Sequence, residues 1–207
     1  MPASAFNPLL KDSIIYGLGQ ILSRFIGFLL LPLFTSYLTP QDYGIIAILG
    51  IMNLVVISLF SFGFNVATGL CYFDSDDTQR KAETLWSSLA ILAASVFALG
   101  MAALIAPVEI SGMLFQTADR ARLVSLSLLS AALIILNTQL LLFLMFEKRA
   151  VLYVTITSFI TVFTLMLSVI AVVALGRGVG GMIESMAAAN AYAAYDRLLK
   201  AAKGAQP

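Results

Sequence analysis

The sequence contains no histidine and only one cysteine, Cys71, among its 207 residues. A single cysteine cannot form an internal disulfide. Without histidine or a cysteine cluster, the chain lacks the usual ligands of zinc, haem and iron–sulfur centres. Catalysis by a histidine acid or base is excluded for the same reason. We therefore expect no bound metal and no cofactor.

Charged residues are also scarce, at 11% of the chain against about 25% in ordinary soluble domains. The 12 Lys and Arg residues nearly balance the 11 Asp and Glu residues, so there is no basic excess for binding nucleic acid. By contrast, 60% of the residues are hydrophobic and the mean hydropathy is +0.97. A soluble domain of this size leaves too much surface in water to hide them. We therefore predict a membrane protein.

Long uncharged runs predict the membrane spans. They cover residues 43–73, 84–108, 123–146 and 150–176, and each exceeds the ~20 residues that cross a bilayer as a helix. A fifth apolar stretch, 13–38, is interrupted only by Arg24. The runs are too long for strands and lack their alternation. We predict an all-α polytopic membrane helix bundle of five transmembrane helices, near 13–38, 44–70, 85–107, 123–146 and 150–175, plus a weak sixth.

The C-terminal end differs from the rest. We assign residues 1–181 to one transmembrane lobe and residues 182–207 to an atypical Ala-rich tail or incomplete sixth helix. Only 11 uncharged residues separate Glu184 from Asp196, too few to span comfortably. Three alternatives stay open: a sixth helix forms poorly, begins earlier at Val179, or lies on the membrane surface.

The loop cations favour a cytoplasmic N-terminus, because cytoplasmic loops carry the excess of Lys and Arg. That side would hold five cations and the opposite side three: Lys11, Arg80, Lys81, Lys148 and Arg149 against Arg120, Arg122 and Arg177.

Arg24 is the most informative single residue. It lies near the middle of the first predicted span, where an arginine costs about 2.5–3.5 kcal/mol on insertion scales. Such a cation usually faces a bundle interior or a wet cavity. Gln20 lies one turn earlier, on the same small and polar stripe. The alternative is that the helix boundary is shifted and Arg24 reaches the interface.

Two further spans carry polar stripes. One includes Asn53 and Asn65, and the other is a series of hydroxyls in the fifth span, made up of Thr157, Thr161, Thr164 and Ser168. Helix packing is the competing explanation for each stripe. Taken with Arg24, the stripes favour a polar path between helices, with Arg24, Gln20, Asn53 and Asn65 as candidate substrate-binding residues. The cluster Asn137–Thr138–Gln139 cannot face one way and stays unassigned.

One glycine pattern imitates a different function, that of a dinucleotide-binding motif. Gly176, Gly178 and Gly181 match G-x-G-x-x-G, but the preceding run is too long for the strand of a dinucleotide-binding unit. A turn at a membrane exit is the better interpretation. The carboxylates are scattered at loop edges, with no pair placed for acid–base catalysis. We therefore predict that the protein is not an enzyme.

Several motifs resemble the N-terminal signature of polysaccharide-biosynthesis flippases. They are Tyr-Gly at 16–17, Leu-Pro-Leu-Phe-Thr at 31–35, Tyr-Leu-Thr-Pro-Gln-Asp-Tyr-Gly at 37–44, Phe-Gly-Phe-Asn-Val-Ala-Thr at 62–68, and Leu-Gly-Arg-Gly-Val-Gly-Gly-Met-Ile-Glu-Ser at 175–185. The resemblance covers about residues 10–186. It identifies the chain as similar to O-antigen and exopolysaccharide translocases of the multidrug/oligosaccharidyl-lipid/polysaccharide exporter superfamily.

This resemblance implies a fold of two helical lobes around a cavity, of which the chain supplies the N-terminal lobe. It also implies a lipid-linked oligosaccharide as substrate, moved between leaflets of the bacterial cytoplasmic (inner) membrane during lipopolysaccharide or other surface polysaccharide biosynthesis. In such proteins cavity cations are thought to hold the pyrophosphate of the lipid carrier, and Arg24 matches that role. Other expected partners are membrane lipids and a second lobe or another copy of the chain.

The chain offers one lobe where the family has two, so we expect a truncated or half-length form. The alternative from a different class is a non-transporting membrane subunit or a truncated relic. Drug efflux ranks below both, because it predicts an acidic residue inside a span and none of the long runs has one.

Overall fold

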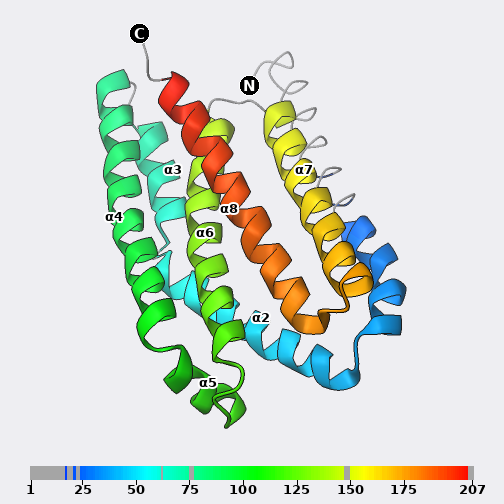
Figure 1. The fold of residues 1–207 in the computed structure, drawn as a ribbon. Coiled ribbons are helices and arrows are strands. Elements are labelled where there is room, and N and C mark those ends of the chain that lie inside the picture. The colour runs from blue at the N-terminus through cyan, green and yellow to red at the C-terminus, as the bar shows by residue number, and fades with distance from the viewer. Residues whose placement is uncertain are drawn as a thin grey trace.

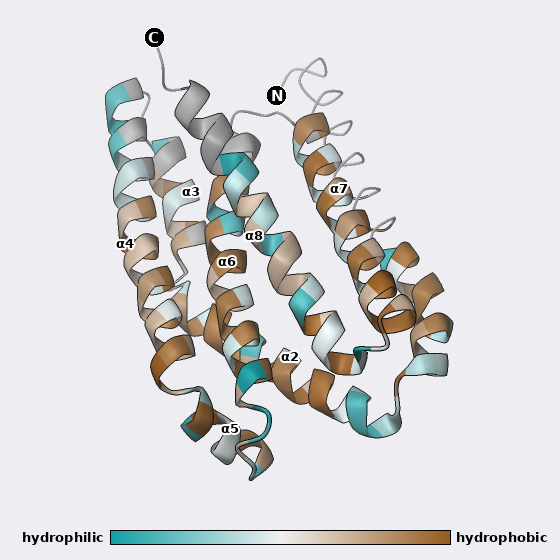
Figure 2. Ribbon diagram, viewed as in Figure 1, coloured by the Kyte–Doolittle hydropathy of each residue, from teal (hydrophilic) through white to brown (hydrophobic). Residues whose placement is uncertain are grey.

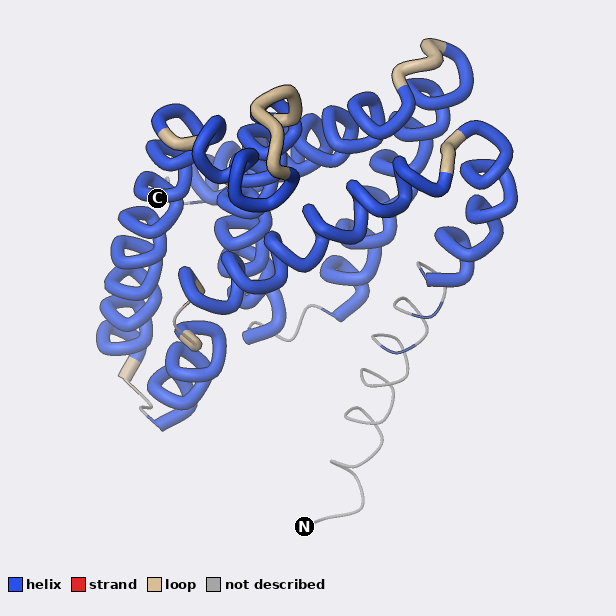
Figure 3. Tube along the Cα trace, turned by 90° about the horizontal axis from the view of Figure 1, so that it is seen from below, coloured by secondary structure: helices blue, strands red, loops and turns tan. Residues whose placement is uncertain are grey.

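The computed structural model is helical and describes residues 17, 21, 24–61, 63–74, 77–146 and 150–204. No strand occurs in this part of the chain (Figure 3). Its elements are the helix Arg24–Tyr37, α2 (Pro40–Phe60), α3 (Phe64–Asp74), α4 (Thr78–Ile105), α5 (Pro107–Phe115), α6 (Ala121–Phe146), α7 (Ala150–Val169), the π-helical turn η1 (Ile170–Ala174) and α8 (Gly178–Gly204).

Four helices are long and apolar enough to cross a membrane: Pro40–Phe60, Trp86–Ile105, Ala121–Leu142 and Val151–Ala174. They overlap four of the five predicted spans and indicate a multi-pass membrane protein. Within the remaining predicted span, 13–38, the described helix Arg24–Tyr37 is shorter than a membrane span. The all-helical class is confirmed, whereas five spans are not.

Helix α6 forms the centre of the bundle. It lies between α4 and α8, and α7 packs on the other side of α8 (Figure 1). In the apolar window of α6, 56% of the residues are buried, against 11% in α2 and 17% in α7. The outer helices, which consist largely of hydrophobic residues (Figure 2), therefore leave most of their apolar side chains exposed. Lipid chains would cover that surface, whereas water would not tolerate so large an apolar area.

The predicted span 44–70 is wrong as a single helix. Helix α2 ends at Phe60, and α3 begins at Phe64 after a short turn. Gly63 has φ +68°, a left-handed conformation that glycine adopts without the steric cost of a side chain. The uncharged run continues through this turn, so charge gaps alone give no sign of the break.

Helix α2 begins earlier than predicted because the residues before it form a capping box. The side chain of Asp42 accepts a hydrogen bond from the backbone nitrogen of Thr39 at 2.8 Å, and the Thr39 hydroxyl accepts one from the Asp42 nitrogen at 3.3 Å. Pro40 occupies the first turn, where its missing N–H is no loss. Three residues of the Tyr-Leu-Thr-Pro-Gln-Asp-Tyr-Gly motif thus have a local structural role.

Residues 178–204 form one continuous helix, α8, packed along α6 and α7. The predicted domain boundary at residue 182 falls inside this helix. Its start agrees with the alternative in which a sixth helix begins near Val179. Gly176 and Gly178 have positive φ where the chain turns into α8, and Gly181, in the first turn of α8, lies too close to Ala171 for a side chain.

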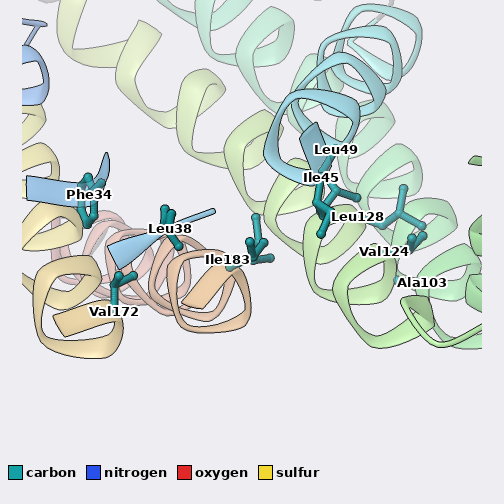
Figure 4. Packing of buried hydrophobic residues seen from close by; sticks show 10 residues of the cluster. Phe34, Leu38, Ile45, Leu49, Ala103, Val124, Leu128, Val172 and Ile183 are labelled. Atoms are coloured by element: carbon teal, nitrogen blue, oxygen red, sulfur yellow. The ribbon is translucent and has the colours of Figure 1, made fainter. Parts of the chain in front are cut away.

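The main hydrophobic core joins the end of the first described helix to α2, α4, α6, η1 and α8. Figure 4 shows one half of it, where Phe34 and Leu38 lie near Val172 and Ile183. The other half joins α2 to α6 and α4, through Ile45, Leu49, Ala103, Val124 and Leu128. This core fixes the first described helix and α8 against the same end of the bundle.

Candidate functional site

Arg24 is the first residue of the continuously described helical stretch Arg24–Tyr37, and it is exposed. Ile26 and Leu30 of this helix instead face α7, where they line an apolar hollow of about 250 Å³. Thr35, three helical turns after Arg24 on the same face, is exposed as well. Arg24 and Thr35 therefore lie on the outer face of the described bundle. Phe28 and Leu31 on the same face are exposed as well, so this face is mixed, whereas Ile26 and Leu30 pack inward.

Asn53 lies in a different environment from Arg24. It is half-buried on α2, and its Oδ1 accepts a hydrogen bond from the hydroxyl of Ser127 on α6 at 3.1 Å. A small cavity of about 130 Å³ adjoins this pair between α2, α6 and α8. Gln20 lies outside the described residues. Asn65 lies on α3, with its side chain outside the described part.

The hydroxyl stripe of α7 is directed toward the bundle, where Thr157, Thr161 and Thr164 are half-buried and Ser168 is buried. Each hydroxyl donates to the carbonyl one turn earlier in α7, at distances of 2.7–2.9 Å. Because these groups find acceptors within their own helix, helix packing accounts for this stripe.

The unassigned cluster in α6 contacts two neighbouring helices. Asn137 donates from Nδ2 to the carbonyl of Asn190 on α8 at 3.0 Å. Thr138 donates to Ile134 in its own helix at 2.8 Å, and Gln139 donates to Ser88 on α4 at 3.0 Å. Consecutive residues of one helix project about 100° apart, so the cluster connects α6 to helices on two sides.

The polar interface between α6 and α8 was not among the predicted sites. Arg197 is only 7% exposed, and its Nη1 donates to the backbone oxygen and to Oδ1 of Asn137, at 2.8 and 2.9 Å. Nearer the start of α8, Asn190 donates to the hydroxyl of Ser130 at 3.3 Å. One pattern in the sequence could have indicated this interface. Small or polar residues recur every four positions along one face of α8, and all of them are buried: Gly181, Ser185, Ala189, Ala193 and Arg197.

One carboxylate joins two arginines at the start of this interface. Glu184 of α8 forms an ion pair with each of them: its Oε1 lies 2.6 Å from Nη2 of Arg122 on α6, and its Oε2 lies 2.7 Å from Nη1 of Arg177. Both guanidinium groups are largely exposed, so the pairs add little to stability. The single negative charge of Glu184 nevertheless offsets part of the positive charge that Arg122 and Arg177 bring together near the start of α8.

Among the described residues, no group of three His, Cys, Asp or Glu side chains could hold a metal ion. Comparison of the chain with protein-family models, with curated proteins and with solved structures gave no match.

Proposed function

We propose that the chain forms one lobe of a membrane translocase that moves a lipid-linked oligosaccharide across the bacterial cytoplasmic membrane without changing it chemically. The observation that carries the proposal is Arg24, an exposed cation on an apolar helix of a multi-pass protein. Within the bilayer an arginine costs about 2.5–3.5 kcal/mol unless something compensates it. An anionic ligand, or water in a cavity closed by a second lobe, would supply that compensation.

The chemistry of Arg24 suits a phosphate-bearing substrate. A guanidinium donates two parallel hydrogen bonds to phosphate oxygens and stays charged at every accessible pH. The pyrophosphate of a lipid carrier is such a group. Motifs similar to those of polysaccharide-biosynthesis flippases, which flank Arg24 at 16–17 and 31–35, support this substrate class.

The geometry around Asn53 favours the Arg24 face as the substrate side. The Asn53 oxygen already accepts from Ser127, and the adjoining cavity of about 130 Å³ is small for an oligosaccharide. We therefore propose that Asn53 holds α2 against α6, while the sugar passes along the face that carries Arg24.

We also propose that α8 completes the lobe as a sixth crossing segment. A helix of 27 residues is about 40 Å long, enough to cross a bilayer core. Its buried polar side chains find partners on α6, which lowers the cost of placing them in the membrane. The beginning of α4 lies at the opposite end of the bundle from the beginnings of α6 and α8 (Figure 1). This arrangement is compatible with the five-to-three division of loop cations on which the proposal of a cytoplasmic N-terminus rests.

A binding measurement tests the role of Arg24. The purified chain would be incubated in detergent with a polyprenyl pyrophosphate that carries a fluorescent sugar, and the bound fraction measured by native mass spectrometry. We expect Arg24→Ala to weaken binding at least about tenfold, because hydrogen bonds to a charged group contribute about 1.5–3 kcal/mol. Arg24→Lys, which keeps the charge but not the paired geometry, should bind at an intermediate level.

Arg120→Gln is the matched control, because it removes a cation from the connection between α5 and α6. It should bind as the unmodified chain does. Equal binding by Arg24→Ala would overturn the role of Arg24. A chain that binds no pyrophosphate lipid would favour the non-transporting subunit.

A further inference from the structure

A groove with a volume of about 470 Å³ lies between α3 and α4. The two helices run antiparallel, so the beginning of α4 lies beside the end of α3. At that end the groove is lined by Arg80, Glu83 and Cys71. One cation and one anion therefore lie within a single turn of α4.

The lining changes in character along the groove. Past the charged end come the hydroxyls of Thr68, Ser87 and Ser88, and then the apolar side chains of Phe64 and Ile91. From Arg80 to Ile91 the helix rises about 16 Å. The polar layer of a leaflet is about 5–7 Å thick, so the groove extends through that layer into the hydrocarbon.

The position of Trp86 places this change at the membrane surface. Trp86 is 69% exposed and begins the apolar window of α4, and tryptophan is enriched where the membrane meets water. Arg80 and Glu83 precede it on the same helix. The charged end of the groove therefore lies at the level of lipid headgroups.

A buried polar group in the groove also lacks a partner. Thr68 is only 2% exposed, and its hydroxyl makes no hydrogen bond within the described structure. Buried hydroxyls normally have a partner. A ligand with oxygen acceptors at the middle of the groove would supply one.

We propose that this groove binds phosphatidylethanolamine, with the phosphate at Arg80, the ammonium at Glu83, the ester oxygens at the hydroxyls and an acyl chain along Phe64 and Ile91. The paired charges favour a headgroup that carries both signs. Phosphatidylglycerol has no ammonium for Glu83. The trimethylammonium of phosphatidylcholine has no N–H to donate to it. The site is separate from Arg24 and does not depend on translocation.

Cys71 provides a direct readout, because it is exposed, lines the groove and is the only cysteine in the chain. The rate of maleimide labelling would be measured on the purified chain in detergent, with and without dioleoyl phosphatidylethanolamine. At a lipid concentration of about ten times Kd, mass action predicts labelling about tenfold slower. Phosphatidylglycerol and phosphatidylcholine should leave the rate near its lipid-free value.

Arg80→Gln and Glu83→Gln should each abolish the protection, when each variant is compared with its own lipid-free rate. The control variants Arg120→Gln and Asp119→Asn make the same charge changes on the connection between α5 and α6, and should keep it. Native mass spectrometry should show retained phosphatidylethanolamine in the controls and its loss in the groove variants.

Equal protection by all three lipids, or protection that persists in both groove variants, would overturn the proposal. Soluble glycerophosphoethanolamine separates the lipid from its headgroup. If this compound slows the labelling of Cys71 as much as the lipid does at the same concentration, the acyl chain contributes nothing to binding. The proposal that the groove binds a lipid would then be wrong.

Discussion

Arg197 and Asn137, sixty positions apart in the sequence, join α8 to α6 through one guanidinium nitrogen. Nη1 of Arg197 donates to the backbone oxygen of Asn137 at 2.8 Å and to its Oδ1 at 2.9 Å. The amide of Asn137 in turn donates to the carbonyl of Asn190. Asn137 thus uses both its acceptor and its donor on α8, which fixes how α8 lies along α6.

Replacement of this arginine should loosen α8. We expect Arg197→Met to lower the free energy of unfolding by about 1.5–3 kcal/mol, because hydrogen bonds from a buried charged group are lost. Unfolding by SDS titration would measure the change, and hydrogen exchange should increase in α8. Arg120→Gln, on the connection between α5 and α6, serves as the control. Unchanged exchange in α8 would contradict the role of this contact.

The close approach of Gly181 to η1 should exclude any larger residue. A Cβ at Gly181 would lie 2.9 Å from the Cβ atoms of Ala171 and Arg177, closer than real side chains pack. We expect Gly181→Ala to destabilise the protein by about 1–3 kcal/mol. At Gly100 on α4 a Cβ meets nothing within 4 Å, so Gly100→Ala should be neutral or stabilising. Equal melting temperatures for the Gly181→Ala and Gly100→Ala variants would show that Gly181 does not pack closely against Ala171 and Arg177.

The hydrogen bond from Gln139 to Ser88 predicts an asymmetric response. Gln139 is fully buried, and its Oε1 has no partner within the described structure. Ser88→Ala would remove the acceptor of Nε2 as well, at a cost of about 1–3 kcal/mol. The double variant Ser88→Ala/Gln139→Leu removes both groups and should unfold at a higher SDS fraction than Ser88→Ala alone. The reverse order would show that Gln139 has another partner.

Glu184 should contribute little despite its two ion pairs. Arg122 and Arg177 are 78% and 58% exposed, and exposed pairs contribute about 0.2–1 kcal/mol each. We expect Glu184→Gln to lower the melting temperature slightly at low salt and not at all near 1 M salt, where screening acts over about 3 Å. A large effect that persists at high salt would mean that these pairs are shielded from solvent.

Local sequence signals located the long helices well. Charge gaps locate α4, α6 and α7 with η1, since a bilayer-length apolar run without charge has few stable structures other than a helix. The break at Gly63 escapes this signal, because a glycine turn changes neither charge nor hydropathy. Thr39 and Asp42 could have marked the start of α2, since the capping box depends on residues three apart.

The sequence by itself determined the membrane class, the helical fold and the approximate spans, because these follow from composition and from interactions along one helix. Only the tertiary structure decided which polar side chains turn inward. Arg24, interpreted as a cavity residue, is exposed on the described bundle. Arg197, which follows an uncharged run judged too short to span a membrane comfortably, is buried against Asn137. The partner that makes a buried charge tolerable lies on another helix, and helical spacing within one segment does not reveal it.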